Sequence, residues 1–308
     1  MTPGARRRRS QDVAFRWVTG LWSLLPEPVA LRVGAAMGLF VGSVLRMRRR
    51  DVRRHLEWAF PDRSARWRRR VARASYAHLG REAVVMFRSG GWSVERVLER
   101  TSVVGFEAFR EASAAGAGLI LLTGHLGNWE IGGAAIAARG VPLDVVGKGM
   151  SNRGFEEDLF AVRERMGMRV IEMGDAPKEV LRSLGRGRVV ALLGDQNAHG
   201  GGVFLPFFGR AASTVRGPAL FAARSGAPVW VAFAIRDPGR RQRYTVTFEP
   251  VPFTPTGRAE EDATTLMGDY ARALESAIRG APEQYFWQHR RWKKRPDEEP
   301  SSEDQVTS

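Results

Sequence analysis

The sequence predicts an α/β protein in which a central, mostly parallel sheet is flanked by helices and preceded by a helical amino-terminal region. Short apolar runs that alternate with longer helix-like stretches carry this prediction, because strands buried on both faces read as continuous apolar segments. The best example is AGLILLT at residues 117–123. The charge is the second observation, since nearly all of the positive excess lies in the first hundred residues.

The predicted elements follow one another in a regular order downstream of residue 105. Strands are expected at residues 117–123, 141–147, 169–172, 189–193 and 229–235. Helices are expected near residues 128–138, 151–166, 175–185, 214–225 and 258–279. Such alternation is typical of a sheet covered by helices on both faces. Residues 243–249 (RYTVTFE) alternate in polarity, which indicates an antiparallel or edge strand.

Composition excludes several classes of protein. The chain has 308 residues, of which 44% are apolar, so it can bury a full core and is not disordered as a whole. It contains no cysteine, which excludes a disulfide scaffold, a cysteine nucleophile, an iron–sulfur cluster and a thiolate zinc site. The formal charge is +15, and residues 1–100 hold 22 Lys and Arg against 8 Asp and Glu. This region is therefore expected to meet an anionic partner.

The partner that best fits the first hundred residues is a membrane surface. The uninterrupted apolar run from Val33 to Leu45 has 13 residues, whereas a spanning helix needs about 20. We therefore expect a helix that lies on the membrane or inserts shallowly. Arginines interleaved with aromatic residues suit anionic lipid, and no nucleic-acid-binding motif is present. A buried helix with an arginine-rich solvated face is the alternative.

These observations divide the chain into three predicted regions. Residues 1–100 form a basic, helical, membrane-associating region, and residues 101–295 form the α/β catalytic domain. Residues 296–308 are polar and acidic, which predicts a disordered tail. No motif suggests an oligomer, and a monomer is expected.

One segment, Thr123 to Glu130, combines a strand end, two glycines and two titratable side chains. His125 would lie on a tight turn at the carboxyl edge of the sheet, where open α/β sheets bind ligands. Five residues along a regular helix would point His125 and Glu130 apart, so they can pair only if His125 lies in the turn. Such a pair would be a general base and its orienting carboxylate. The alternative is a helix-capping histidine with a glutamate that complements the helix dipole.

No protein nucleophile accompanies this segment. The sequence has no GxSxG elbow, no cysteine and no HExxH zinc motif. Asp195 and His199 lie four residues apart in a glycine-rich loop, which is a poor basis for a metal site, so no metal is expected. A histidine–carboxylate pair without a nucleophile suits activation of a substrate hydroxyl that attacks an electrophile directly.

HLGNWE at residues 125–130 fits the H-x4-D/E signature of glycerolipid-type acyltransferases, and its surroundings resemble the late acyltransferases of lipid A biosynthesis. Three further blocks carry the resemblance: RRHLEWAFP at 53–61, DQ at 195–196 with VFLPFFG at 203–209 and ST at 213–214, and PEQYFWQHRRWK at 282–293. The resemblance covers roughly residues 12–296. His55 stands where asparagine is usual, and Arg153 stands where proline is usual.

The resemblance implies an enzyme of the bacterial inner membrane that faces the cytoplasm and has a glycerolipid acyltransferase-like fold. It would transfer a fatty acyl chain from an acyl carrier protein thioester, or from coenzyme A, to a hydroxyl of a lipid A precursor. No cofactor and no acyl-enzyme are implied. The alternatives are transfer to another glycolipid, such as a phosphatidylinositol mannoside, and a membrane-surface lipid-binding protein without activity.

The resemblance also assigns site residues. His125 and Glu130 would be the catalytic dyad, and Arg163 falls where the family has an arginine near the thioester. Asp195 falls at the family's DQ aspartate, where it could also tie loops together or pair with Arg163.

Chemistry adds four groups of candidates. The tetrahedral transition state develops negative charge, which Arg163 or the backbone N–H groups around Gly127 and Asn128 could stabilise. Lys148 and Arg153 could meet phosphates of the acceptor. Phe204, Phe207 and Phe208 are expected in the core or in the wall of an acyl pocket. His289, with its arginine neighbours, would pack under the site or contact phosphate.

Overall fold

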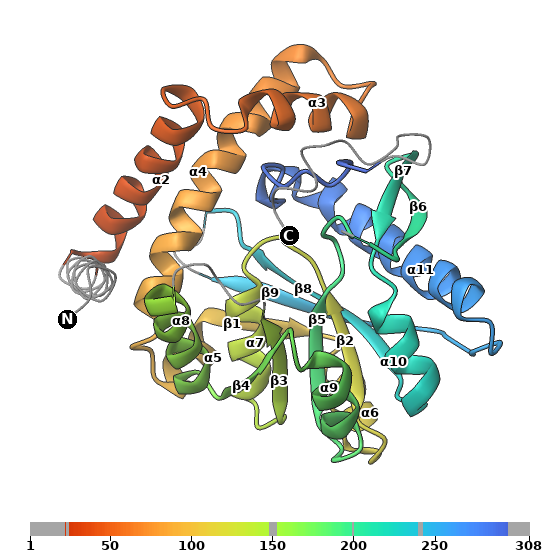
Figure 1. Cartoon of the computed structure of the whole chain (residues 1–308). Helices are drawn as coiled ribbons and strands as arrows, with labels where there is room; N and C mark the ends of the chain where they lie inside the picture. Colours follow the sequence, from red (N-terminus) through yellow and green to blue (C-terminus); the bar gives the residue numbers. More distant parts are fainter. Residues whose placement is uncertain (1–21, 23–24, 148–152, 199, 240–242, 295–308) are drawn as a thin grey trace, which may run out of the picture.

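A computed structural model describes Trp22 and residues 25–147, 153–198, 200–239 and 243–294. Its centre is a seven-stranded sheet in the order β1-β9-β8-β2-β5-β3-β4 (Figure 1). Every neighbouring pair is parallel except β8 and β9. The strands are β1 (Thr101–Val104), β2 (Leu119–Thr123), β3 (Leu143–Gly147), β4 (Met168–Glu172), β5 (Val189–Leu193), β8 (Val229–Arg236) and β9 (Tyr244–Val251).

The predicted mostly parallel sheet is thus confirmed, and all five continuous apolar runs are strands. The alternating segment at 243–249 forms β9, which is antiparallel to β8 as predicted. It is not an edge strand, however, because β1 pairs with its other side. β1 was not predicted, because this strand has only four residues, TSVV, of which half are apolar.

Helices cover both faces of the sheet, as expected. One face packs against α5 (Val94–Arg100), α6 (Phe106–Ala114) and α7 (Trp129–Ala137). The other packs against α9 (Ala176–Leu184), α10 (Gly217–Ser225) and α11 (Ala259–Gly280). Successive residues of β2 point to opposite faces of the sheet: Leu121 packs in the core on the α7 side, and Leu122 packs in the core on the α11 side. α8 (Arg153–Arg165) contacts the edge strand β4.

A hairpin of β6 (Val203–Phe207) and β7 (Arg210–Thr214) was not predicted. It packs through Phe207 and Phe208 against the aromatic side chains of the carboxyl-terminal segment. These two phenylalanines are core residues, as one of the two interpretations held, while Phe204 is exposed. The strand β6 was not predicted because a proline at position 206 interrupts its apolar run, and proline is unusual within strands.

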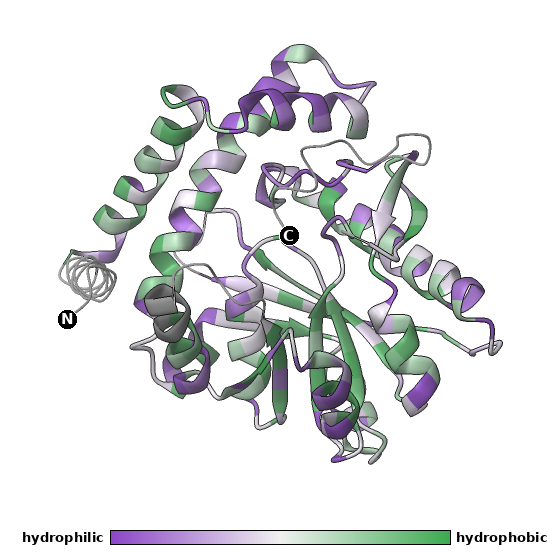
Figure 2. Ribbon diagram, viewed as in Figure 1, coloured by the Kyte–Doolittle hydropathy of each residue, from purple (hydrophilic) through white to green (hydrophobic). Residues whose placement is uncertain are grey.

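Within residues 25–147, three helices precede α5 and lie along one side of the α/β layer (Figure 1). They are α2 (Glu27–Ser43), α3 (Arg49–Ala59) and α4 (Ala65–Ser89). α3 is strongly hydrophilic, whereas α2 is mostly apolar (Figure 2). Among the described residues, no helix has both the length and the apolar character needed to cross a membrane. The predicted tail at 296–308 lies outside the described residues.

α2 packs against α4 through glycines spaced four residues apart. A Cβ on Gly38 would lie 2.0 Å from the carbonyl oxygen of Tyr76, and one on Gly34 would lie 2.6 Å from the carbonyl oxygen of Gly80. The two backbones therefore touch, which larger side chains would prevent. The opposite side of α2 exposes an apolar stripe of Val29, Val33, Met37, Phe40 and Val44.

Candidate active site

His125 lies at the carboxyl edge of the sheet, in the turn between β2 and α7. Asp195 follows β5, the strand that pairs with β2 in parallel. Because the carboxyl ends of neighbouring parallel strands meet at one edge, the topology brings these two residues together. Asp195 is 3% exposed and His125 is 9% exposed, so the pair is shielded from solvent.

Both oxygens of Asp195 bind His125. The imidazole Nδ1 lies 2.7 Å from Oδ1, and the backbone N–H of His125 donates to Oδ2 at 2.9 Å. An ionised carboxylate can only accept hydrogen bonds, so Nδ1 carries a proton and Nε2 is the basic nitrogen. The side-chain amide of Gln196 lies 3.2 Å from Nε2. One aspartate thus fixes the position, the orientation and the tautomer of the histidine.

Electrostatics favour the ion pair between these residues. Burial alone would lower the pKa of His125, but the charge of Asp195 and its hydrogen bond outweigh burial, so the pKa is raised above its ordinary value. Burial would raise the pKa of Asp195, but His125 holds the pKa below its ordinary value. The site therefore stabilises the imidazolium that forms when His125 takes a proton.

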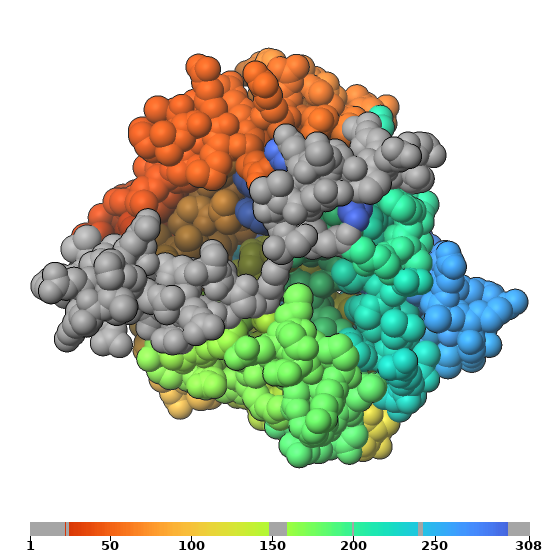
Figure 3. Space-filling model, viewed as in Figure 1, coloured from red at the N-terminus to blue at the C-terminus, as the bar shows by residue number. Residues whose placement is uncertain are grey.

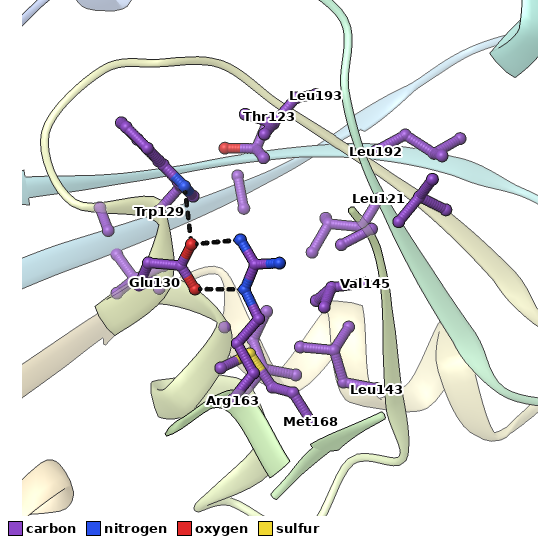
Figure 4. A pocket seen from close by; sticks show the side chains of 18 residues that line it. Leu121, Thr123, Trp129, Glu130, Leu143, Val145, Arg163, Met168, Leu192 and Leu193 are labelled. Carbon is purple, nitrogen blue, oxygen red and sulfur yellow. Dashed lines mark hydrogen bonds and ion pairs between the residues drawn. The ribbon is translucent and has the colours of Figure 1, made fainter. Parts of the chain in front are cut away.

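Glu130 does not hold the imidazole, which corrects the predicted orientation of the pair. Its carboxylate binds Arg163 of α8 in a two-pronged ion pair, with Nε donating at 2.9 Å and Nη2 at 2.6 Å (Figure 4). The indole of Trp129 donates to the same carboxylate at 3.1 Å. Glu130 still contributes a smaller electrostatic effect that raises the pKa of His125.

The turn has the geometry that the two glycines predicted, but its N–H groups are not available for an oxyanion. Gly127 has φ +64°, and a Cβ there would lie 1.9 Å from the carbonyl oxygen of Ala234. The backbone N–H of Gly127 donates to the carbonyl of Gln284, and that of Asn128 donates to the carbonyl of Ala234. The predicted backbone oxyanion donors are therefore already paired within the fold.

The side chain of Asn128 instead builds the site. Its Oδ1 accepts from the backbone N–H of Ile131 and caps α7, and its Nδ2 donates to Glu82 at 2.7 Å. Glu82 belongs to α4 and also accepts from Arg236 at 2.9 Å and from Tyr244 at 2.6 Å. This buried carboxylate was not predicted from the sequence, because its partners come from three distant segments.

The structure describes only some of the remaining candidates. Lys148 and His199 lie outside the described residues, and Arg153 begins α8. Arg291 is buried and donates to Thr214 at 2.6 Å, which makes it part of the fold beneath the site. Burial lowers the pKa of His289 to about 4, so this residue is neutral near pH 7.

An apolar pocket opens beside the Glu130–Arg163 pair (Figure 4). It holds about 590 Å³ of space, its open mouth included, and lies between α7 and one face of the sheet. Trp129 lines it, and the Trp129 ring centroid is 4.7 Å from that of His125. Space-filling atoms show a hollow on this side of the molecule, between the N-terminal helices and the α/β layer (Figure 3). His125 and an apolar pocket are thus neighbours.

Comparison with known proteins agrees with the resemblance found in the sequence motifs. The family model of bacterial lipid A biosynthesis acyltransferases matches residues 9–294. The lipid A biosynthesis lauroyltransferase of Escherichia coli is 29% identical over 287 residues, 91% of each chain. The palmitoleoyltransferase of the same organism is 27% identical over 284 residues, 91% of this chain and 90% of that one.

A second group of relatives matches over a shorter stretch. The phosphatidylinositol mannoside acyltransferase of Mycolicibacterium smegmatis is 30% identical over 165 residues, which is 52% of this chain and 53% of that one. The family model, in contrast, covers nearly the whole chain, including all four sequence blocks and the His125–Asp195 pair. The chain therefore belongs to the bacterial lipid A biosynthesis acyltransferase family and is an acyltransferase.

Proposed function

We propose that the protein transfers a fatty acyl chain from an acyl carrier protein thioester to a hydroxyl group of a lipid A precursor. The observation that carries the proposal is a histidine, fixed by a buried aspartate, next to an apolar pocket. The similarity to the lauroyl- and palmitoleoyltransferases over about nine-tenths of the chain supports the glycolipid acceptor. Several arginines of α3 and α4 are exposed, which suits an acidic carrier protein.

In this proposal His125 acts as the general base. Its Nε2 takes the proton of the acceptor hydroxyl while the hydroxyl oxygen attacks the thioester carbonyl carbon. The tetrahedral intermediate collapses, the carbon–sulfur bond breaks, and the leaving thiolate takes the proton back from the imidazolium. Asp195 stabilises that imidazolium through its hydrogen bond to Nδ1. No step requires a protein nucleophile.

Arg163 is the group best placed to stabilise the oxyanion. It lines the apolar pocket, and its side chain is only 11% exposed. A cation in such a dry site interacts strongly with developing negative charge. Glu130 then serves as the residue that positions Arg163, because its two oxygens hold the guanidinium by two nitrogens.

We further propose that the enzyme works at a membrane surface, on its cytoplasmic face. The apolar stripe of α2 is exposed, and it is followed by exposed arginines at positions 46, 48, 49 and 50. An apolar face beside a cluster of arginines is the combination that binds anionic lipid. Both substrates would then be collected at one surface, one from the membrane and one from solution.

The test uses purified protein, an acyl carrier protein thioester and a lipid A precursor. Wild type is expected to form the acylated glycolipid, and His125→Ala is expected to form none. Because this variant leaves Asp195 buried without its imidazole partner, it should unfold at a lower temperature than wild type, and circular dichroism shows that it is folded at the assay temperature. Equal product from both proteins would remove His125 from the mechanism. If wild type acylates a phosphatidylinositol mannoside and not the lipid A precursor, the proposed acceptor is wrong although the chemistry stands.

A further inference from the structure

The lining of the apolar pocket extends from one edge of the sheet toward the other. Thr123 and Leu193, the last residues of β2 and β5, line one end of it, whereas Leu143 and Met168, the first residues of β3 and β4, line the other, here called the inner end (Figure 4). These strands are parallel, and the five residues of β3 span about 13 Å. The pocket therefore runs inward from the Glu130–Arg163 pair across much of the sheet.

Met168 occupies the inner end of the pocket together with α7. It is 1% exposed and pairs with Leu143 across the two strands. A Cβ placed on Gly133 of α7 would lie 2.4 Å from the sulfur of Met168. The thioether thus fills the space that an ordinary side chain at position 133 would take. Gly133 lets α7 approach the sheet, and Met168 closes the gap between them.

We propose that Met168, seated against Gly133, sets the length of the acyl chain that the enzyme accepts. The inference rests on the proposed function, because it requires an acyl chain in this pocket. A chain that reaches Met168 fills the pocket, and one further methylene must displace a packed thioether. In apolar pockets such a difference changes kcat/KM by roughly 10- to 200-fold. The methionine side chain is flexible, so it can adjust to a slightly longer acyl chain more easily than a branched side chain could.

Two substitutions change this end of the pocket in opposite directions. Met168→Ala removes three side-chain heavy atoms and extends the pocket. Gly133→Ala adds a methyl group where the sulfur now lies, so the thioether must move into the pocket and shorten it. The ratio of kcat/KM for long over short chains should rise roughly tenfold in the first variant and fall roughly tenfold in the second.

The experiment measures kcat/KM for a series of saturated acyl thioesters, from octanoyl to stearoyl, with one acceptor. Met166→Ala is the matched control, because Met166 is also buried, at 8% exposure, yet does not line the pocket. It should keep the chain-length profile of wild type. Thermal unfolding midpoints show whether each variant is folded, and Met168→Val, a smaller truncation that also extends the pocket, replaces Met168→Ala if that variant does not fold.

The outcomes separate this inference from the proposed function. If wild type turns over none of the thioesters, the proposed function fails. If wild type is active and its chain-length profile is unchanged in the folded Met168 and Gly133 variants, the acyl chain ends elsewhere and this inference is overturned. A shift of the same size in Met166→Ala would also overturn it, since general loosening of the core would then explain the change.

Discussion

Two of the buried carboxylates at the site, Asp195 and Glu130, each bind a cationic or protonatable partner. Asp195 binds His125, and Glu130 binds Arg163. Taking a charge out of water costs several kcal/mol, which only a close, well-aligned partner repays. In the proposed mechanism the two pairs have different roles: Asp195 holds the base His125, and Glu130 holds the cation Arg163 beside the pocket.

The Glu130–Arg163 pair makes a prediction about stability. Glu130→Gln leaves the guanidinium of Arg163 buried without a compensating charge, so the free energy of unfolding in urea should fall by about 3 kcal/mol. Acyl transfer should fall as well, because Arg163 is no longer held at the pocket. Glu107→Gln, which breaks the exposed pair with Arg110, should leave the unfolding curve unchanged. Unchanged stability in Glu130→Gln would mean that the buried pair does not form in solution.

For the individual residues, the sequence predicted which side chains belong to the site but not which of them pair with each other. His125, Glu130, Arg163 and Asp195 do lie around one site, yet spacing along the chain favoured the neighbours His125 and Glu130. The indole of Trp129 bonds to Glu130 and its ring stacks edge-on against His125, so it occupies the region between them. Asp195 is seventy residues away and reaches His125 only because β2 and β5 are adjacent. The order of the strands in the sheet could not be predicted from the sequence.

Among the elements, α2 has two faces with different tasks. Its glycine face touches α4 at backbone distance, and its apolar stripe is exposed. The sequence predicted a helix that lies on the membrane or inserts shallowly, since the apolar run from Val33 to Leu45 is too short to span a bilayer. The spacing of the glycines on α2 explains why this helix packs closely on the protein. The structure adds that Gly80 of α4 faces these glycines, so the two backbones can approach each other.

We predict that membrane binding depends on two side chains of the apolar stripe of α2, Met37 and Phe40. Met37 and Phe40 are 54% and 52% exposed, so inserting them buries substantial apolar surface. Met37→Ser with Phe40→Ser should weaken binding to vesicles containing anionic lipid by roughly tenfold or more, measured by flotation. Val104→Ser, at an exposed apolar residue of β1, is the matched control and should bind as wild type does. Equal binding by the double variant would place the lipid contact elsewhere.

Over the whole molecule, charge and chemistry occupy different regions that meet at the site. The arginine-rich helices carry most of the positive excess, and the α/β layer carries His125, Asp195 and the pocket. α4 joins the two, because Glu82 reaches Asn128 at the start of α7. Strand–helix alternation predicted the layers well. The β6–β7 hairpin and β1 were missed, since neither has a continuous apolar run.

The pH dependence of acyl transfer tests the central claim that Asp195 holds the catalytic base. A general base works in its neutral form, so kcat/KM should fall as the pH drops through the raised pKa of His125. Asp195→Asn removes the charge that raises this pKa and leaves burial, which lowers it. The acid limb should therefore move to lower pH, and the plateau kcat should fall by roughly 10³- to 10⁴-fold.

Glu130→Gln is the comparison in the same measurement, because Glu130 makes the smallest of the contributions that raise the pKa of His125. We predict a large shift of the acid limb for Asp195→Asn and only a small one for Glu130→Gln. A large shift for Glu130→Gln together with none for Asp195→Asn would contradict the account and return the orienting role to Glu130.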